Sequence, residues 1–236
     1  MGYSQDERLA VCATLEKAGP DAPTLCAGWT TTDLAAHLVL RERRPDAAAG
    51  IPGGPLAGHT AKVQQRLAAT PYPALLATIR SGPPRLSLFA IPALDERVNT
   101  VEFFVHNEDV RRAAPDWAPR DISPGLSDAL WDRLRMARFT LRKAPVGVEF
   151  ARNDDGAGPG GKEDGADGKE GRSGGNGTAE APEFRMMVRR STPVVTVIGK
   201  PAELILWASG RTSAAQVRLD GTAAATAMLS QATWRL

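Results

Sequence analysis

The residues with the clearest capacity for chemistry are a glutamate and a histidine, Glu102 and His106, in a stretch that reads as one helix over residues 99–113. Residues four positions apart project from the same face of a helix. The neighbouring valines and phenylalanines give this face an apolar setting. A carboxylate and an imidazole that point into the interior need hydrogen bonds, an opposite charge or a metal ion to offset their lost hydration. The pair therefore indicates either a metal site or a simple Glu–His hydrogen bond on the helix surface.

A second histidine favours the metal interpretation. His37 lies between two leucines in a predicted helix over residues 29–43, so we expect it to face inward as well. Thr30 is the expected N-cap of this helix, and Asp33 follows three residues later in a variant of the capping box. Two inward histidines and one inward carboxylate make a plausible set of metal ligands.

Two further residues belong to types that bind metals. Cys26 lies just before the helix of His37 and is an outside candidate for a ligand, whereas His59 lies at a loop-to-helix junction and is expected to be an exposed capping or surface residue. The chain has only two cysteines, Cys12 and Cys26, which do not make a disulfide framework. We expect both to be buried free thiols in a reducing compartment.

The composition excludes several function classes. The 236 residues are 42% hydrophobic, and 29 basic against 27 acidic side chains give a formal net charge of only +2. The arginines are scattered rather than gathered in a basic stripe, so we expect no nucleic-acid partner. The polar start of the chain is unlike a signal peptide, and no apolar run reaches the roughly 18 residues that span a bilayer. We therefore expect a cytoplasmic protein with no membrane partner.

The order of the predicted elements divides the chain into two parts. The first is all-helical, with helices predicted over residues 5–18, 29–43, 60–69, 73–81, 99–113 and 123–143. The second combines strands predicted over residues 146–151, 184–188, 194–198 and 215–219 with helices over 201–209 and 222–234. We predict an α+β protein, with an up-down four-helix bundle in residues 1–144 and a small α+β domain in residues 145–236.

The second domain is interrupted by a glycine-rich stretch. Residues 153–181 hold ten glycines in 29 positions, interspersed with charged side chains. Such a composition cannot bury enough apolar surface to offset the entropy of ordering it, so we predict a disordered insertion in a hairpin.

Three motifs resemble those of the mycothiol-dependent maleylpyruvate isomerase family, which belongs to the DinB-like group of metal-binding four-helix bundles. The motifs are Trp29-Thr30-x-x-Asp33-Leu34-x-Ala36-His37-Leu38, Glu102-x3-His106-x2-Asp109-x-x-Arg112-Ala113, and the stretch from Gly199 to Arg211 with its closing Gly-Arg. The third is similar to the family's small C-terminal domain, which looks like a sterol-carrier domain. The chain departs from the family in its glycine-rich insertion and in Asn107-Glu108, where such proteins often have Gly-Trp.

The resemblance implies that His37, Glu102 and His106 ligate one divalent metal ion, most often zinc, with one position left for water or a thiol. Asp33 and Asp109 could orient the two imidazoles, or serve as a helix cap and as a partner of an arginine. Arg211 is the implied catalytic residue of the second domain, where it would hold an anionic substrate or thiol. Its alternative role is to end its helix after Gly210.

The implied function is a mycothiol-dependent metalloenzyme. A thiol activated by the metal would add to a small electrophile, and the net reaction would be an isomerisation or an S-transfer. The alternative is a non-catalytic protein that binds a metal or a small ligand, and a third reading is metal-dependent hydrolysis, which lacks a separate general base. The residues leave the oligomeric state open, with a monomer favoured.

Overall fold

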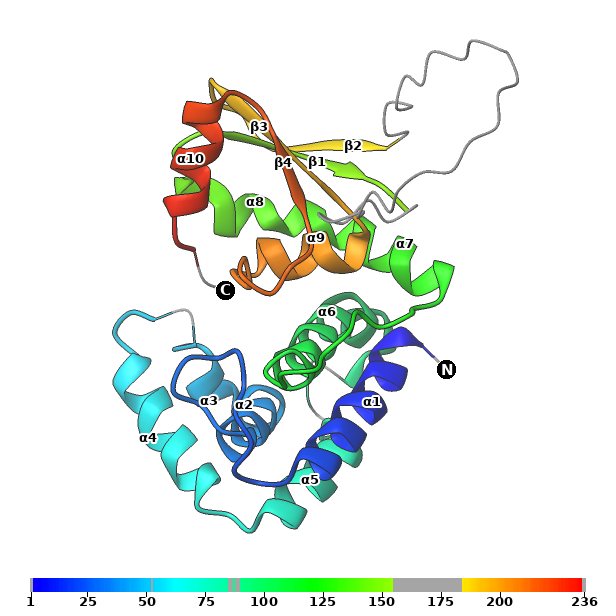
Figure 1. Cartoon of the computed structure of the whole chain (residues 1–236). Coiled ribbons are helices and arrows are strands. Elements are labelled where there is room, and N and C mark those ends of the chain that lie inside the picture. Colours follow the sequence, from blue (N-terminus) through cyan, green and yellow to red (C-terminus); the bar gives the residue numbers. More distant parts are fainter. Residues whose placement is uncertain (1, 52, 85–86, 88–89, 155–183, 235–236) are drawn as a thin grey trace, which may run out of the picture. The chain divides into compact units, whose positions relative to one another are not determined.

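The computed structural model describes residues 2–51, 53–84, 87, 90–154 and 184–234 (Figure 1). The described chain forms two compact units, which divide between Leu126 and Ser127. The first is helical and the second has a small mixed sheet with helices, so the predicted α+β class is confirmed. The predicted domain boundary at 144/145 stays a prediction.

The first unit consists of helices. They are α1 (Tyr3–Ala18), α2 (Thr31–Arg43), α3 (Pro45–Ala48), α4 (Ala57–Ala68), α5 (Tyr72–Arg80) and α6 (Pro92–Arg111), followed by the start of α7 (Pro124–Arg133). Helix α1 lies along α6, while α2 packs on α4 and α5. No helix in the described ranges is long and apolar enough to cross a membrane.

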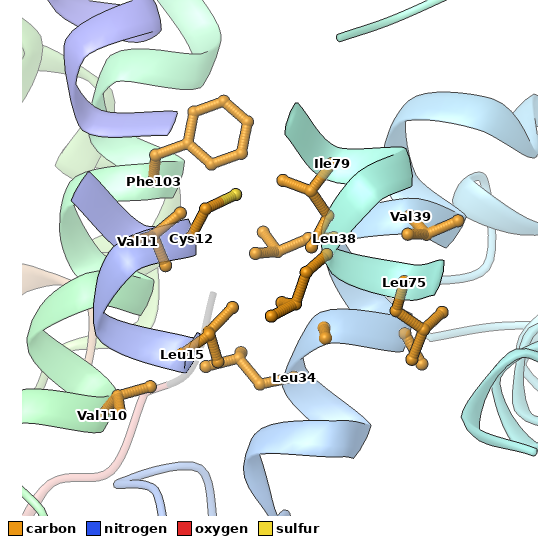
Figure 2. Packing of buried hydrophobic residues seen from close by; sticks show 13 residues of the cluster. Val11, Cys12, Leu15, Leu34, Leu38, Val39, Leu75, Ile79, Phe103 and Val110 are labelled. Atoms are coloured by element: carbon orange, nitrogen blue, oxygen red, sulfur yellow. The ribbon is translucent and has the colours of Figure 1, made fainter. Parts of the chain in front are cut away.

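Four of these helices share one core. Figure 2 shows apolar side chains from α1, α2, α5 and α6 meeting there. They include Val11 and Leu15, Leu34 and Leu38, Leu75 and Ile79, and Phe103 and Val110. The named residues of each helix are four or seven positions apart, a spacing that places them on one face. The bundle therefore fixes α2 and α6, the two helices that carry the candidate ligands.

The prediction of one continuous helix over residues 123–143 is wrong. After α7 the chain forms a 3₁₀ turn, η2 (Leu134–Met136), a short helix, α8 (Ala137–Thr140), and a second 3₁₀ turn, η3 (Leu141–Lys143). The buried side chains Leu130, Leu134, Ala137 and Leu141 still recur three or four residues apart. Apolar spacing alone does not distinguish an α turn from a tighter 3₁₀ turn, because both bring residue i+3 close to residue i.

The second unit is built on a four-stranded sheet. Its strands are β1 (Gly147–Arg152), β2 (Arg185–Arg189), β3 (Val194–Gly199) and β4 (Arg218–Asp220), in the order β2-β1-β3-β4. Strand β1 pairs antiparallel with β2 and parallel with β3, and β4 runs antiparallel to β3. The helices α9 (Pro201–Ala208) and α10 (Ala223–Gln231) complete the unit.

The sheet and α9 bury an apolar core of their own. Val148 and Phe150 of β1 and Leu204 and Leu206 of α9 are fully buried. The rings of Phe150 and Trp207 meet edge to face with their centroids 6.0 Å apart. The glycine-rich insertion predicted at residues 153–181 lies, from residue 155 onward, outside the described residues.

Candidate metal centre

Helix α2 presents His37, and its start is fixed by a complete capping box. The Asp33 backbone N–H donates to the Thr30 side chain, and the Thr30 backbone N–H donates to Asp33 Oδ2 at 2.9 Å. The predicted N-cap at Thr30 is therefore confirmed, and Asp33 has the capping role of the two foreseen for it. His37 lies two turns further along and is 8% exposed.

Helix α6 presents Glu102 and His106. It begins at Pro92, seven residues before the predicted start at residue 99, and holds both side chains well inside regular helix. His106 is 7% exposed, and the Glu102 side chain is 21% exposed. The local helix therefore fixes this pair, as the i, i+4 spacing predicted.

The two helices bring the three predicted side chains together. Glu102 Oε1 lies 3.3 Å from His37 Nε2 and 3.2 Å from His106 Nε2. The centroids of the two imidazole rings are 5.1 Å apart, at an interplanar angle of 71°. One donor atom from each residue lies within 4.8 Å of the others, the spacing of a group that could hold a metal ion. We call these three residues the His–Glu–His cluster.

Asp109 stands behind His106. Its Oδ2 accepts from His106 Nδ1 at 2.9 Å, and the carboxylate is fully buried. The thiol of Cys26 donates to the same oxygen at 3.2 Å. A hydrogen bond to Nδ1 fixes the tautomer in which Nε2 has the lone pair that a metal needs. Asp109 is therefore placed to orient His106, one of the two roles foreseen for it.

The ionisation of the cluster reflects burial and neighbouring charge. Burial opposes the imidazolium of His106, but hydrogen bonds to Asp109, Cys26 and Glu102 outweigh it and raise the His106 pKa well above 6.5. Burial disfavours the Glu102 carboxylate, but Arg41 and the two histidines hold its pKa well below 4.5. Burial lowers the pKa of His37 below 6.5.

The contact between His106 and Glu102 requires a positive species at Nε2, which a metal ion could supply. When His106 is neutral and its Nδ1–H donates to Asp109, Nε2 has a lone pair that faces a carboxylate oxygen at 3.2 Å. Two lone pairs at that separation repel each other unless a positive species lies with them, either a proton on Nε2 or a metal ion. Two imidazoles and a carboxylate are a common donor set for zinc, with one position left open.

Sequence reasoning missed Arg41. Its Nε lies 3.1 Å from Glu102 Oε1, and its Nη1 donates to Asn99 Oδ1. Arg41 is four residues after His37 on α2 and Asn99 is three residues before Glu102 on α6, so the same spacing rule that paired Glu102 with His106 could have found both.

Three other side chains of metal-binding types, His59, Cys26 and Glu108, do not belong to the His–Glu–His cluster. The exposed His59 pairs with Asp46 at 2.8 Å, as expected of a surface residue. Cys26 is half-buried and forms a second possible ligand group with His106 and Asp109. The buried Glu108 accepts from Arg111 and Arg112, both at 2.7 Å.

Arg211 lies in the second compact unit, at the end of α9. Its backbone N–H donates to the Leu206 carbonyl and that of Gly210 donates to the Trp207 carbonyl, which together make a Schellman cap. Gly210 takes φ of 86°, the left-handed conformation that this cap requires. The Arg211 guanidinium donates to the Ser209 carbonyl at 2.7 Å. The helix-ending role foreseen for Arg211 is therefore present.

Two helices of the bundle bring two imidazoles and a carboxylate together. This is the arrangement of a DinB-like, metal-binding bundle. Residues 4–136 match the family described as the mycothiol maleylpyruvate isomerase N-terminal domain. The match spans more than half of the chain, and the chain belongs to this family. No curated protein and no solved structure matches the chain.

Proposed function

We propose that the protein is a mycothiol-dependent metalloenzyme that adds a low-molecular-weight thiol to a small electrophile. The observation that carries the proposal is the His–Glu–His cluster in a member of this family. The sulfur would form a bond to the electrophilic carbon, and the thiol proton would end on the adduct. An S-transferase would release that adduct, whereas an isomerase would break the same C–S bond later and return the thiol.

In this proposal His37, Glu102 and His106 hold one divalent ion, most simply zinc. A bound zinc ion supplies the Lewis acidity that keeps a thiol deprotonated at neutral pH. Asp109 would hold the proton of His106 on Nδ1 and orient the ring, so that Nε2 is the nitrogen that would bind the ion. Arg211 of the second unit would hold the anionic group of the substrate or thiol, because a guanidinium matches a carboxylate with two parallel hydrogen bonds.

The alternative function is a non-catalytic protein that binds a metal or a small ligand. The proposed sterol-carrier-like character of residues 145–236 would suit it, since such a domain can hold an apolar molecule without chemistry. Both proposals assume a cytoplasmic monomer. Its partners would be small molecules, and not nucleic acid or a membrane.

The first test is metal content by elemental analysis of purified wild type, His37→Ala, His106→Ala and His59→Ala. We expect about one zinc per chain in the wild type and in His59→Ala, and loss of zinc in the other two variants. His59 is the matched control, because it is a histidine that also contacts a carboxylate but lies at the surface. Equal metal content in all four proteins would contradict the assignment of ligands.

The second test separates an enzyme from a carrier. Zinc-loaded protein that consumes electrophiles only in the presence of mycothiol would support the enzyme. Stoichiometric zinc without any thiol-dependent turnover would favour the alternative. Arg211→Gln keeps the backbone cap and should lower turnover without changing zinc content, while the exposed Arg218 of β4 supplies the matched control Arg218→Gln.

A further inference from the structure

His106 faces a different group of potential ligands with each of its two ring nitrogens. Its Nε2 lies 3.2 Å from Glu102 Oε1 in the His–Glu–His cluster, whereas its Nδ1 lies 2.9 Å from Asp109 Oδ2. Cys26 belongs to the Nδ1 side, because its Sγ lies 3.2 Å from the same Asp109 oxygen and also forms a hydrogen bond with His106. A sulfur, a nitrogen and an oxygen therefore meet there. We call Cys26, His106 and Asp109 the Cys–His–Asp cluster.

The backbone holds these three groups in place. The Leu25 backbone N–H donates to the Asp109 carbonyl at 3.0 Å, which ties the segment before α2 to α6. The Thr24 hydroxyl donates to the Trp29 carbonyl at 3.0 Å and accepts from the Cys26 backbone N–H at 3.2 Å, so the turn that carries the thiol is closed on itself. One donor atom from each member of the cluster lies within 4.8 Å of the others. An ion could therefore bind without any rearrangement of the backbone.

The charges and donor atoms of the Cys–His–Asp cluster suit a soft divalent cation. A thiolate and a carboxylate carry two negative charges, which neutralise the charge of such an ion. Neutrality matters here because Asp109 is fully buried and Cys26 is half-buried, so water screens an uncompensated charge weakly. A sulfur ligand favours soft ions over magnesium and calcium, which prefer oxygen. The ion would take the place of the thiol proton and the Nδ1 proton, which both point at Asp109 Oδ2.

The two clusters compete for His106. A neutral imidazole has one nitrogen with a lone pair and one that carries the proton. With an ion in the His–Glu–His cluster, Nε2 supplies the lone pair and Nδ1–H donates to Asp109. With an ion in the Cys–His–Asp cluster, Nδ1 supplies the lone pair and Nε2–H donates to Glu102 Oε1, across the 3.2 Å contact already present. His106 can therefore serve either cluster but not both at once.

We propose that Cys26, His106 and Asp109 form a second cation site, which takes thiophilic divalent ions such as cadmium and draws His106 away from the His–Glu–His cluster. The second site stands on its own three residues, whereas the competition rests on the ligand set of the proposed function. A thiophilic ion bound at Cys26 would inhibit the proposed enzyme, because its zinc ion would lose one of three protein ligands.

The test is a cadmium titration of the zinc-free, full-length chain, kept reduced by a phosphine so that no free thiol competes. The ultraviolet absorption of the cadmium–thiolate bond reports binding to sulfur directly. The proteins are wild type, Cys26→Ser, Asp109→Asn, His37→Ala and Cys12→Ala. Cys12 is the matched control, because it is the second cysteine of the chain and is buried in the bundle core away from the cluster.

We expect the wild type to develop this absorption until one sulfur-bound cadmium is present per chain. Cys26→Ser should lose it, and Asp109→Asn should bind this cadmium at least about tenfold more weakly, because the amide removes one of the two negative charges. His37→Ala and Cys12→Ala should both keep it, since neither residue belongs to the Cys–His–Asp cluster. In zinc-loaded wild type the absorption should appear only as zinc is released.

Three results would overturn the inference. An absent cadmium–thiolate absorption in the wild type, or its survival in Cys26→Ser, would remove the second site. Equal cadmium affinity in wild type and Asp109→Asn would reduce the site to a single thiol. Absorption that develops while all zinc stays bound would contradict the competition for His106. None of these results touches the proposed function, which fails instead if wild type and His37→Ala bind equal amounts of zinc.

Discussion

The cluster shows at the scale of single residues how a polar group becomes tolerable inside a protein. His106 is buried and Glu102 is half-buried in α6, and each has partners that offset its lost hydration. Asp109 does this by fixing the imidazole of His106, and Arg41 by pairing with the carboxylate of Glu102. The cluster depends on these flanking groups as much as on the three candidate ligands.

Replacing Asp109 tests the orientation of His106. We expect Asp109→Asn to lower zinc affinity about 10–100-fold, because the neutral amide binds Nδ1–H less strongly and no longer fixes the tautomer. Competition against a chelator of known affinity measures the effect. Asp33→Asn is the control, since Asp33 lies one turn from His37 but belongs to the capping box. A similar loss in both variants would argue against a specific role for Asp109.

The raised pKa of His106 predicts how zinc binding depends on pH. A metal must displace the proton of the imidazolium, so zinc affinity should fall as the pH falls through this raised pKa, by about tenfold per pH unit. The loss should begin above pH 6.5, the ordinary pKa of histidine. The lowered pKa values of His37 and Glu102 leave those groups unprotonated in this range. Chelator competition between about pH 6 and 9 checks the slope, and a flat profile would contradict it.

At the scale of elements, charged side chains join the helices of the bundle. Arg8 of α1 is fully buried and donates twice to Glu42 of α2, both at 2.6 Å. It also lies 3.4 Å from Asp95 of α6, and its guanidinium stacks 4.5 Å from the ring centroid of Phe103. Through Asn99 this group continues to Arg41, so the packing of three helices and the setting of the cluster are linked.

Removing Arg8 should therefore be costly. We expect Arg8→Met to lower the free energy of unfolding by about 3–5 kcal/mol, because it leaves the buried Glu42 carboxylate without its main partner. Urea unfolding followed by circular dichroism measures this loss. Adding Glu42→Leu to Arg8→Met should recover part of it, since a buried ion pair can be replaced by apolar residues. No recovery in the double variant would show that Arg8 acts mainly through Asp95 and Phe103.

At the scale of the whole molecule, the candidate ligands are unevenly distributed. His37, Glu102 and His106 all lie before residue 127, in the first compact unit. The second unit has its own core around Phe150, Leu204 and Trp207. Bound metal should therefore stabilise the first unit selectively, because a ligand stabilises only the structure that binds it.

Calorimetry can test this distribution. Removing metal with a chelator should lower the transition temperature of the first unit and leave that of the second unchanged. If metal was present at a thousand times its dissociation constant, the first unit should lose about 4 kcal/mol of its free energy of unfolding. Phe150→Ala should do the reverse and cost the second unit about 3–5 kcal/mol. A single transition that shifts as a whole in both experiments would show that the two units unfold together.

Local sequence determined much of this protein. The helices of His37, Glu102 and His106, the cap at Thr30 and the alternating strands around Val148 and Val197 follow from spacing and capping rules that act over a few residues. The same rules gave helix α6 too late a start and joined α7 to the turns after it. Apolar periodicity does not reveal that a helix continues through a polar run such as Asp95-Glu96-Arg97, nor that α geometry changes to 3₁₀.

The amino-acid sequence by itself determined which side chains share a helix face, because that depends only on helical geometry. Only the tertiary structure decided which faces meet: His37 reaches Glu102 across 65 positions, Cys26 reaches Asp109 across 83, and Arg41 finds Asn99 across 58. Contacts of this range depend on the packing of the whole bundle core. Local spacing places Arg41 one turn from His37, but only the fold shows that Arg41 pairs with Glu102 and Asn99 and that Cys26 lies beside Asp109.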